Sequence, residues 1–211
     1  PCNKSYTIAG KRLLILTLTY HPVYEMKNLR AFFFILLAFA ATSYSPPYPG
    51  AIYVVRKSQV VFHSNAKLEL IKASSSDLKG IIDAEKRTFA FSVSIKSFDG
   101  FNGPLQKEHF NENYLESDKY ANATFTGHII EEDDFTRDGN YNIRAKGKFV
   151  IHGVEQERLL QGDLVVKNGT IKLVCIFTVL LSEHDIKIPR IVHEKLAAEI
   201  NVIVNAEFTR Q

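Results

Sequence analysis

The chain has 211 residues, a formal net charge of +3 and a sequence pI near 8.8. Residues 1–43 hold five of the 26 basic residues and one of the 23 acidic residues, which leaves 21 basic and 22 acidic residues, a net charge of −1, in residues 44–211. Nucleic-acid binding requires a concentrated basic surface that displaces counterions, so this near-neutral composition excludes a nucleic-acid-binding domain.

An apolar segment near the N-terminus is typical of a secretory signal peptide. Met26 is followed by two basic residues, by the eleven-residue apolar run 31–41 and by small residues up to Ser43. That run is too short for a retained membrane span, which needs roughly 20 residues; a buried core helix is the alternative interpretation. We predict cleavage after Ser43 and a location in the periplasm or outside the cell, with no integral membrane span.

This interpretation divides the chain into three parts. Residues 1–25 are expected to be an upstream segment that is not normally translated, residues 26–43 the signal peptide, and residues 44–211 one mature domain. A domain of 168 residues hides about 70% of its unfolded surface, so burial is sufficient to hold it together. Once Cys2 is removed with the leader, Cys175 has no cysteine with which to form an internal disulfide.

From residue 52 onward, apolar and polar residues alternate with period two, which is the signature of strands with one buried face. The clearest alternation predicts strands at 89–95, 142–151, 171–181 and 200–208. Weaker alternation predicts further strands at 52–57, 59–64, 67–73, 78–84, 121–131 and 155–166.

Turns and helices complete the predicted topology. Short glycine-containing connections at 138–140 and 168–169 are of the hairpin kind. A polar segment at 104–113, opened by proline, is the one persuasive helix, and a second short helix is predicted at 189–198. Many antiparallel strands with one long helical connection predict an all-β fold, an antiparallel lipocalin-like β-barrel of about eight strands with one or two short helices in its connections.

Three blocks carry a resemblance to a known family. The first is a short polar helix that passes through Asn113, Tyr114 and Leu115 directly into a strand; the others contain the sequences KGKFVIHGV and FTVLLSEHDIKI. They occupy residues 106–127, 146–154 and 177–188. In this order and spacing the chain resembles the YceI-like family over about residues 52–209. The family usually has Tyr-Pro where this chain has Tyr120-Ala121, and often has a hydroxyl residue where it has Glu155.

The resemblance implies a lipocalin-like barrel, and the family members characterised as binders hold polyisoprenoid lipids inside that barrel. The expected partner is therefore an apolar lipid of the polyisoprenoid or isoprenoid quinone type. No cofactor is expected, and a homodimer is compatible with the sequence.

The inward strand faces mix aromatic and very small residues, which suits a cavity for a long hydrocarbon. Such residues also interdigitate in a solid core, which is the alternative. The residues expected to line a cavity, with Phe110 and Tyr114 closing it from the helical connection, are Phe89, Phe91, Phe110, Tyr114, Phe125, Ile143, Phe149, Ile151, Phe177 and Val179. Gly147→Leu and Ala145→Phe are predicted to block ligand uptake while the barrel stays folded.

Polar motifs indicate no enzyme chemistry and no metal site. His109 and His152 either orient a ligand headgroup or, more commonly, cap a turn or face solvent. The acidic run 131–134 is expected to be a solvated hairpin tip, and 183–185 with His193 has no recognised metal-ligand spacing. Cys175 lies on an apolar strand face, where a thiol is usually inert.

The sequence therefore predicts an exported, non-enzymatic protein that holds an apolar isoprenoid-type ligand in its barrel. One alternative is a solid barrel that acts as a structural or partner-binding envelope protein without a ligand. A second is an enzyme that acts on a lipid held in the barrel, for which a polar group deep inside would be needed.

Overall fold

The structure, a computed structural model, describes residues 51–211. The predicted upstream segment and signal peptide therefore lie outside the described residues. In the described part, the strands are β1 (Ile52–Asn65), β2 (Leu70–Ser75), β3 (Lys79–Asp83), β4 (Thr88–Ser94), β5 (Asn122–Ile129), β6 (Gly139–Ile151), β7 (Val154–Lys167), β8 (Thr170–Leu180) and β9 (Glu199–Arg210). The helical segments are η2 (Ile95–Ser97), α2 (Pro104–His109), η3 (Phe110–Tyr114), η4 (Leu181–His184) and η5 (Arg190–Val192).

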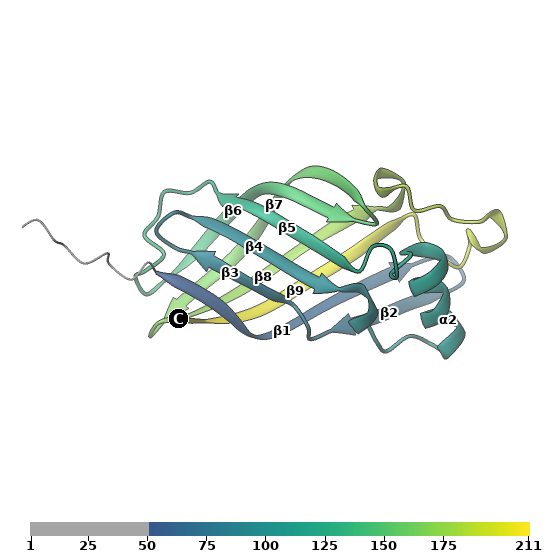
Figure 1. Cartoon of the computed structure of the whole chain (residues 1–211), viewed down its shortest axis with the longest axis horizontal. Coiled ribbons are helices and arrows are strands. Elements are labelled where there is room, and N and C mark those ends of the chain that lie inside the picture. The colour runs from purple at the N-terminus through teal and green to yellow at the C-terminus, as the bar shows by residue number, and fades with distance from the viewer. Residues whose placement is uncertain (1–50) are drawn as a thin grey trace, which may run out of the picture. The chain divides into compact units, whose positions relative to one another are not determined.

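All strand pairs are antiparallel, and the sheet closes on itself because β1, besides pairing with β2 and β3, also pairs with β9. β2 pairs with the second half of β1 and β3 pairs with its first three residues. The two strands are thus consecutive pieces at one position of the ring, and the nine strands among residues 51–211 occupy eight positions (Figure 1). This confirms the predicted antiparallel lipocalin-like barrel of about eight strands.

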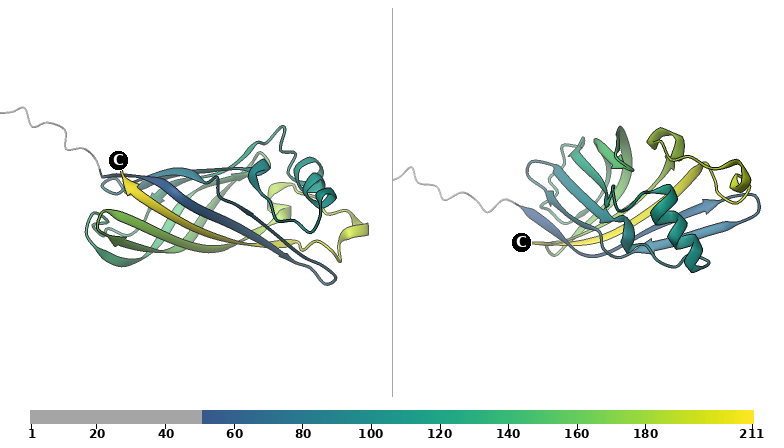
Figure 2. Two further views of the ribbon diagram at one scale, coloured as in Figure 1. Left: turned by 90° about the horizontal axis from the view of Figure 1, so that it is seen from below. Right: turned by 45° about the vertical axis from the view of Figure 1, so that its right-hand side comes forward.

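The barrel has two different ends. α2, η3 and the connection between β8 and β9 lie at one end, which we call the helical end, and the C-terminus lies at the other, which we call the base (Figures 1 and 2). Because β6 to β9 are long, each of them runs from one end to the other and can place residues at both.

Several predicted strand boundaries differ from the structure by one to three residues, and two of the predictions differ for a clear local reason. The segments 52–57 and 59–64 form the single strand β1, in which a bulge between Val55 and Lys57 shifts the register with β9. A bulge inserts one residue and breaks the alternation without ending the strand, which explains the split prediction. The strand predicted at 67–73 begins only at Leu70, because the backbone N–H of Ala66 bonds to the carbonyl of Glu69 and closes a turn there.

The helices also differ in part. The predicted helix at 104–113 is an α-helix only to His109 and continues as the π-helical turn η3. The second predicted helix, at 189–198, is wrong: only the short 3₁₀ turn η5 forms. Backbone groups of this segment bond to the β1–β2 hairpin instead. The N–H of Leu68 donates to the carbonyl of Glu194, and the N–H of Ala197 donates to Ser64 Oγ.

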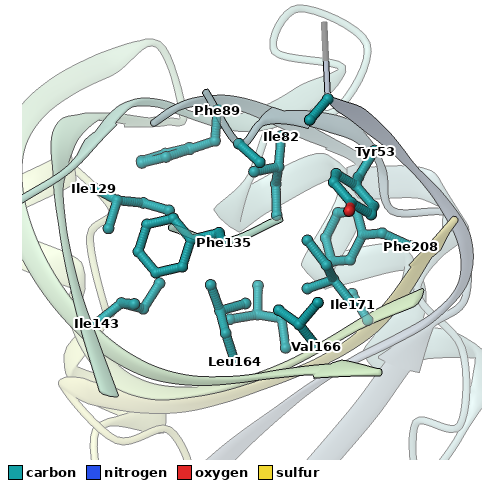
Figure 3. Close-up of a cluster of buried hydrophobic side chains, with 14 residues drawn as sticks. Tyr53, Ile82, Phe89, Ile129, Phe135, Ile143, Leu164, Val166, Ile171 and Phe208 are labelled. Carbon is teal, nitrogen blue, oxygen red and sulfur yellow. The ribbon is translucent and has the colours of Figure 1, made fainter. Parts of the chain in front are cut away.

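A cluster of buried apolar side chains fills the base of the barrel (Figure 3). Phe135, from the connection between β5 and β6, is fully buried, and its ring lies among side chains from strands on all sides. The preceding acidic run is only partly the solvated tip that the sequence predicts. Glu131 accepts hydrogen bonds from Arg144 N at 2.7 Å and Arg144 Nε at 2.8 Å, and these outweigh burial and lower the pKa of Glu131.

Candidate functional site

Two apolar cavities lie inside the described part of the barrel. The cavity nearer the base, the base-side cavity, has a volume of about 90 Å³ and is lined from β3 to β9. The cavity nearer the helices, the helix-side cavity, has a volume of about 150 Å³. Both volumes are below the roughly 300–1,000 Å³ that is common for pockets of drug-sized ligands.

Side chains of both strands and helices enclose the helix-side cavity. Phe110 and Tyr114 of η3 cover it, and Leu181 and Ile186 come from the β8–β9 connection. Within this lining Tyr114 is the one residue whose side chain has a polar group, and burial raises the pKa of its hydroxyl. A lining of this composition favours hydrocarbon and provides almost no hydrogen-bonding partner for a sugar or a nucleotide.

Two rings separate the cavities. Phe149 of β6 and Phe177 of β8 line both of them. Their ring centroids are 5.9 Å apart and their planes are at 80°, an edge-to-face arrangement that aromatic pairs favour. The interior is therefore divided by a pair of aromatic side chains from two strands that are not neighbours in the sheet.

A row of aromatic rings leads to this pair across the inner wall. Successive ring centroids lie 4.9–6.4 Å apart, within the range of favourable aromatic contacts. The row comprises Phe208, Phe91, Phe89, Phe125, Phe149 and Phe177. A second aromatic cluster, of Phe62, Phe98, Phe101 and Phe110, lies at the helical end.

The structure places every predicted lining residue at a cavity. Phe89, Phe91, Phe125 and Ile143 line the base-side cavity; Phe110, Tyr114, Ile151 and Val179 line the helix-side cavity. Phe149 and Phe177 line both. Whether these residues contact a ligand stays a prediction.

The small residues behave differently from the sequence-based expectation. Ala145 and Ala123 line the base-side and helix-side cavities respectively, but neither lining includes Gly127 or Gly147. These two glycines are paired across β5 and β6, where a Cβ on Gly147 would lie 2.2 Å from the carbonyl oxygen of Thr126. The predicted Gly147→Leu variant is therefore not a test with an intact barrel, because its side chain collides with the neighbouring backbone.

The ladder between β7 and β8 stops halfway along the barrel. Backbone pairing extends only from Lys167–Thr170 to Gly162–Cys175, although both strands continue toward the helical end. Side chains bridge the remaining seam: Arg158 donates to the carbonyl of Thr178 and to Glu183 Oε2 at 2.9 Å, and Gln156 Nε2 donates to the carbonyl of Glu183 at 2.9 Å. We call this stretch the β7–β8 seam.

His152 holds the β6–β7 turn in place. With Gly153 it forms a two-residue connection in which both residues have positive φ, 53° and 74°, as tight hairpin turns of the primed type require. His152 Nδ1–H donates to the carbonyl of His184 at 3.0 Å, and Nε2 lies 3.3 Å from Glu116 Oε1. Its ring also contacts Tyr120 at 4.9 Å. This geometry supports the turn-capping interpretation of His152, while His109 is exposed.

The sequence analysis considered His184 only as a possible metal ligand and did not predict its burial beside the aromatic pair. His184 is fully buried, and its Nδ1–H donates to the carbonyl of Val154 at 3.2 Å. Its ring lies edge-to-face with Phe149, 5.4 Å between centroids. Burial lowers the pKa of His184, an effect to which the charge of Arg158 adds. Alternation could not have identified it, because His184 lies in η4, after the strand has ended.

The Cys175 thiol and the possible metal ligands complete the inventory of reactive side chains. Burial, together with the charge of Asp163, raises the pKa of the Cys175 thiol to about 11, so the nucleophilic thiolate is scarce at neutral pH. Among residues 51–211, no three or more His, Cys, Asp or Glu side chains come together as a metal site. No helix in that range combines the length and apolar character needed to cross a membrane.

Comparison with a family model supports this architecture. The model of the YceI-like domain matches residues 53–208, which includes every strand except the ends of β1 and β9. Among curated proteins, none matches this chain.

Solved structures of similar fold come from several bacteria. A polyisoprenoid-binding domain from Saccharophagus degradans, implicated in plant cell wall breakdown, has a TM-score of 0.65 and 13% identity and covers 77% of this chain and 99% of its own. Burkholderia cenocepacia BcnA has a TM-score of 0.60, 14% identity and coverage of 71% and 95%. The Campylobacter jejuni YceI protein has a TM-score of 0.55, 17% identity and coverage of 70% and 86%. At these identities the likeness establishes the fold.

Proposed function

Because this chain belongs to the YceI-like family, we propose that its barrel binds an apolar isoprenoid-type ligand and holds it away from water. The observation that carries the proposal is the pair of apolar cavities inside the closed sheet. The similar fold of a domain from Saccharophagus degradans described as polyisoprenoid-binding supports the same ligand class.

Binding would be passive. Moving a hydrocarbon from water into the barrel contributes about 0.8 kcal/mol for each buried CH₂ group, against an association cost on the order of 4–15 kcal/mol. Among the described residues the cavity walls are mainly apolar, and the Cys175 thiol in the base-side lining stays protonated at neutral pH because its pKa is raised to about 11, which supports a binding protein rather than an enzyme.

We further propose that the protein is exported to the periplasm or secreted after cleavage of the signal peptide at residues 26–43. A carrier of apolar lipid is most useful in an aqueous compartment next to a membrane, where free lipid is insoluble. The observation behind this proposal is the sequence pattern around Met26.

The first experiment is native mass spectrometry of the full chain expressed in a bacterial host, compared with its denatured mass. We expect an excess mass in the native spectrum that organic extraction releases as a prenyl lipid. The denatured mass reports the mature N-terminus, expected at Tyr44, and the native mass also reports whether a homodimer forms. A native mass equal to that of the bare chain, unchanged after prenyl lipid is added, would contradict the proposal.

A solid barrel that binds a protein partner is the second candidate. The small volumes of the cavities, about 90 and 150 Å³, favour it, because side chains already occupy most of the interior. In that case the delipidated protein has the same thermal stability with and without prenyl lipid, whereas a ligand that binds only the native state raises the stability with its concentration.

A further inference from the structure

The two cavities are separated by a barrier of only two side chains. Phe149 and Phe177 line both cavities, and their rings meet edge-to-face at 5.9 Å. A chain that enters the helix-side cavity and continues toward the base must pass this pair. The barrier therefore determines how much of a linear hydrocarbon the barrel accepts.

The size of the helix-side cavity sets a scale for the ligand. An engineered apolar cavity of about 150 Å³ in another protein stays dry and binds benzene, and the helix-side cavity has the same volume. An isoprene unit is comparable in size to benzene, so the end of an isoprenoid chain fits there. Further units would need the base-side cavity, which has about 90 Å³ and lies behind the two rings.

The two rings of the barrier differ in the number of aromatic side chains that contact them. Phe149 is only 8% exposed and contacts the rings of Phe125, Phe177 and His184. Among the described residues, Phe177 has a ring contact with Phe149 and with no other aromatic side chain.

The backbone around Phe177 is also less constrained. Phe177 lies just beyond Cys175, the last residue of β8 that pairs with β7, so only β9 holds this part of the strand through a ladder. The geometry thus makes Phe177 the weaker side of the barrier and Phe149 the anchored side.

We propose that Phe177 determines the chain length of the ligand, and that this protein selects short isoprenoids whose apolar end stops at the Phe149–Phe177 pair. The inference rests on the proposed function and narrows its ligand class. In the wild-type protein the apolar end of a prenol occupies the helix-side cavity, and the units nearer its hydroxyl group remain outside that cavity. Removal of the Phe177 ring joins the cavities and extends the accepted chain.

The test measures the affinities of geraniol, farnesol and geranylgeraniol for the delipidated full chain and for its Phe177→Ala variant. We expect the wild-type affinity to stop increasing after the shortest prenol. In Phe177→Ala, each further buried methylene increases the affinity about fourfold, so farnesol binds at least about tenfold more tightly than geraniol. Because truncation of a large core side chain destabilises a protein, Phe177→Leu serves as the milder variant, with an intermediate effect in the same direction.

Ala145→Leu is the matched control. Ala145 lines the base-side cavity alone, and leucine occupies that cavity without the overfilling that a phenyl group would cause. The geraniol affinity of Ala145→Leu alone is the reference for the double variant with Phe177→Ala. In that double variant the added leucine abolishes the gain for farnesol and geranylgeraniol.

The outcomes separate the inference from the proposed function. A wild-type affinity that rises with chain length as steeply as that of Phe177→Ala overturns the length-selection role and leaves lipid binding intact. A gain in Phe177→Ala that persists in the double variant also overturns it, because the extra chain would then lie elsewhere. Absence of prenol binding by the wild type and by both Phe177 variants overturns the inference and the proposed function together.

Discussion

His184 is a fully buried side chain with only one of its ring nitrogens hydrogen-bonded. Its Nδ1–H donates to Val154, while Nε2 is one of two buried polar side-chain atoms without a partner among residues 51–211; the other is Asn111 Oδ1. Protonation of Nε2 would place a positive charge where no acceptor receives it. Burial therefore lowers the pKa of His184, Arg158 and His152 lower it further, and the Val154 carbonyl and Glu183 only partly oppose this effect.

This arrangement predicts a loss of stability in mild acid. Because the folded-state pKa lies below the ordinary value of 6.5, the stability contribution of neutral His184 is complete above pH 6.5 and is lost as the pH falls through the lowered pKa. Urea unfolding at a series of pH values between 6.5 and 4.5 checks it, since carboxylates of ordinary pKa stay ionised over most of that range. The free energy of unfolding of wild-type protein should decrease toward the acid end.

His184→Asn is the informative variant, because its amide can still donate toward the Val154 carbonyl and does not titrate. We expect its free energy of unfolding to change less with pH than that of the wild type. The other histidines are present in both proteins, so the comparison isolates the effect of His184. Equal slopes would show that His184 is not the group responsible.

Strand pairing explains why glycine occupies two positions at which the sequence suggested room for a ligand. Gly127 and Gly147 face each other across β5 and β6, and a Cβ on either would lie within 2.2 Å of a backbone oxygen on the opposite strand. The two strands approach so closely there that only glycine fits. The pair thus shapes the wall behind Phe89 and Phe125, since Phe89 is paired with Gly127 and the two rings are in contact at 4.9 Å.

We predict that Gly147→Ala destabilises the barrel by at least about 1–3 kcal/mol, the usual cost of overpacking, because the new methyl group displaces the backbone of β5. Urea denaturation followed by circular dichroism measures the loss. Gly103→Ala is the control: Gly103 has extended backbone, and no atom lies within 4 Å of the position that a Cβ would take there, so its stability should change by less than about 0.5 kcal/mol. Similar effects at both positions would refute the close-approach explanation.

The strand pairing also explains the family motif at the β6–β7 turn, which contains His152 and Gly153. A Cβ on Gly153 would lie 2.3 Å from the ring of Tyr120, and the positive φ of Gly153 strains any other residue. Tyr120 thus packs directly over the turn, while His152 links it to η4 and to Glu116. The sequence blocks 106–127, 146–154 and 177–188 meet at this point, although they are far apart in the chain.

At the scale of the whole molecule, one side chain from a loop closes the base. Phe135 is fully buried in the cluster that fills this end (Figure 3), and its ring contacts Tyr141 at 5.2 Å. It lines neither cavity. The base is therefore closed by side-chain packing rather than by a strand.

Phe135→Ala should lower the free energy of unfolding by about 3–5 kcal/mol, as is typical for loss of a buried phenyl group, and leave prenol affinity of the folded protein unchanged. Urea unfolding and a binding titration measure the two effects. Phe101→Ala provides the comparison, because Phe101 is only half-buried and should cost less. A Phe135→Ala loss no greater than that of Phe101→Ala would contradict the role of Phe135 as the closure of the base.

The amino-acid sequence by itself determined the fold class and the residues that face the interior. Alternation with period two depends only on neighbouring residues along a strand, and together with the helical connection it yielded ten predicted lining residues, all of which lie at a cavity. The alternation did not predict two local features. The bulge in β1 interrupts the pattern without ending the strand, and the segment 189–198 forms hydrogen bonds with the β1–β2 hairpin in place of a helix.

Only the tertiary structure decided how the interior is divided. Phe149 and Phe177 meet over the inner side of β7, which lies between β6 and β8 in the sheet, and no local pattern encodes that distance. The same holds for the burial of Phe135 and His184, which lie outside the strands, and for the contact of Gly127 with Gly147. Periodicity predicts which face a residue occupies, whereas the space between faces depends on curvature, register and closure, which are properties of the whole barrel.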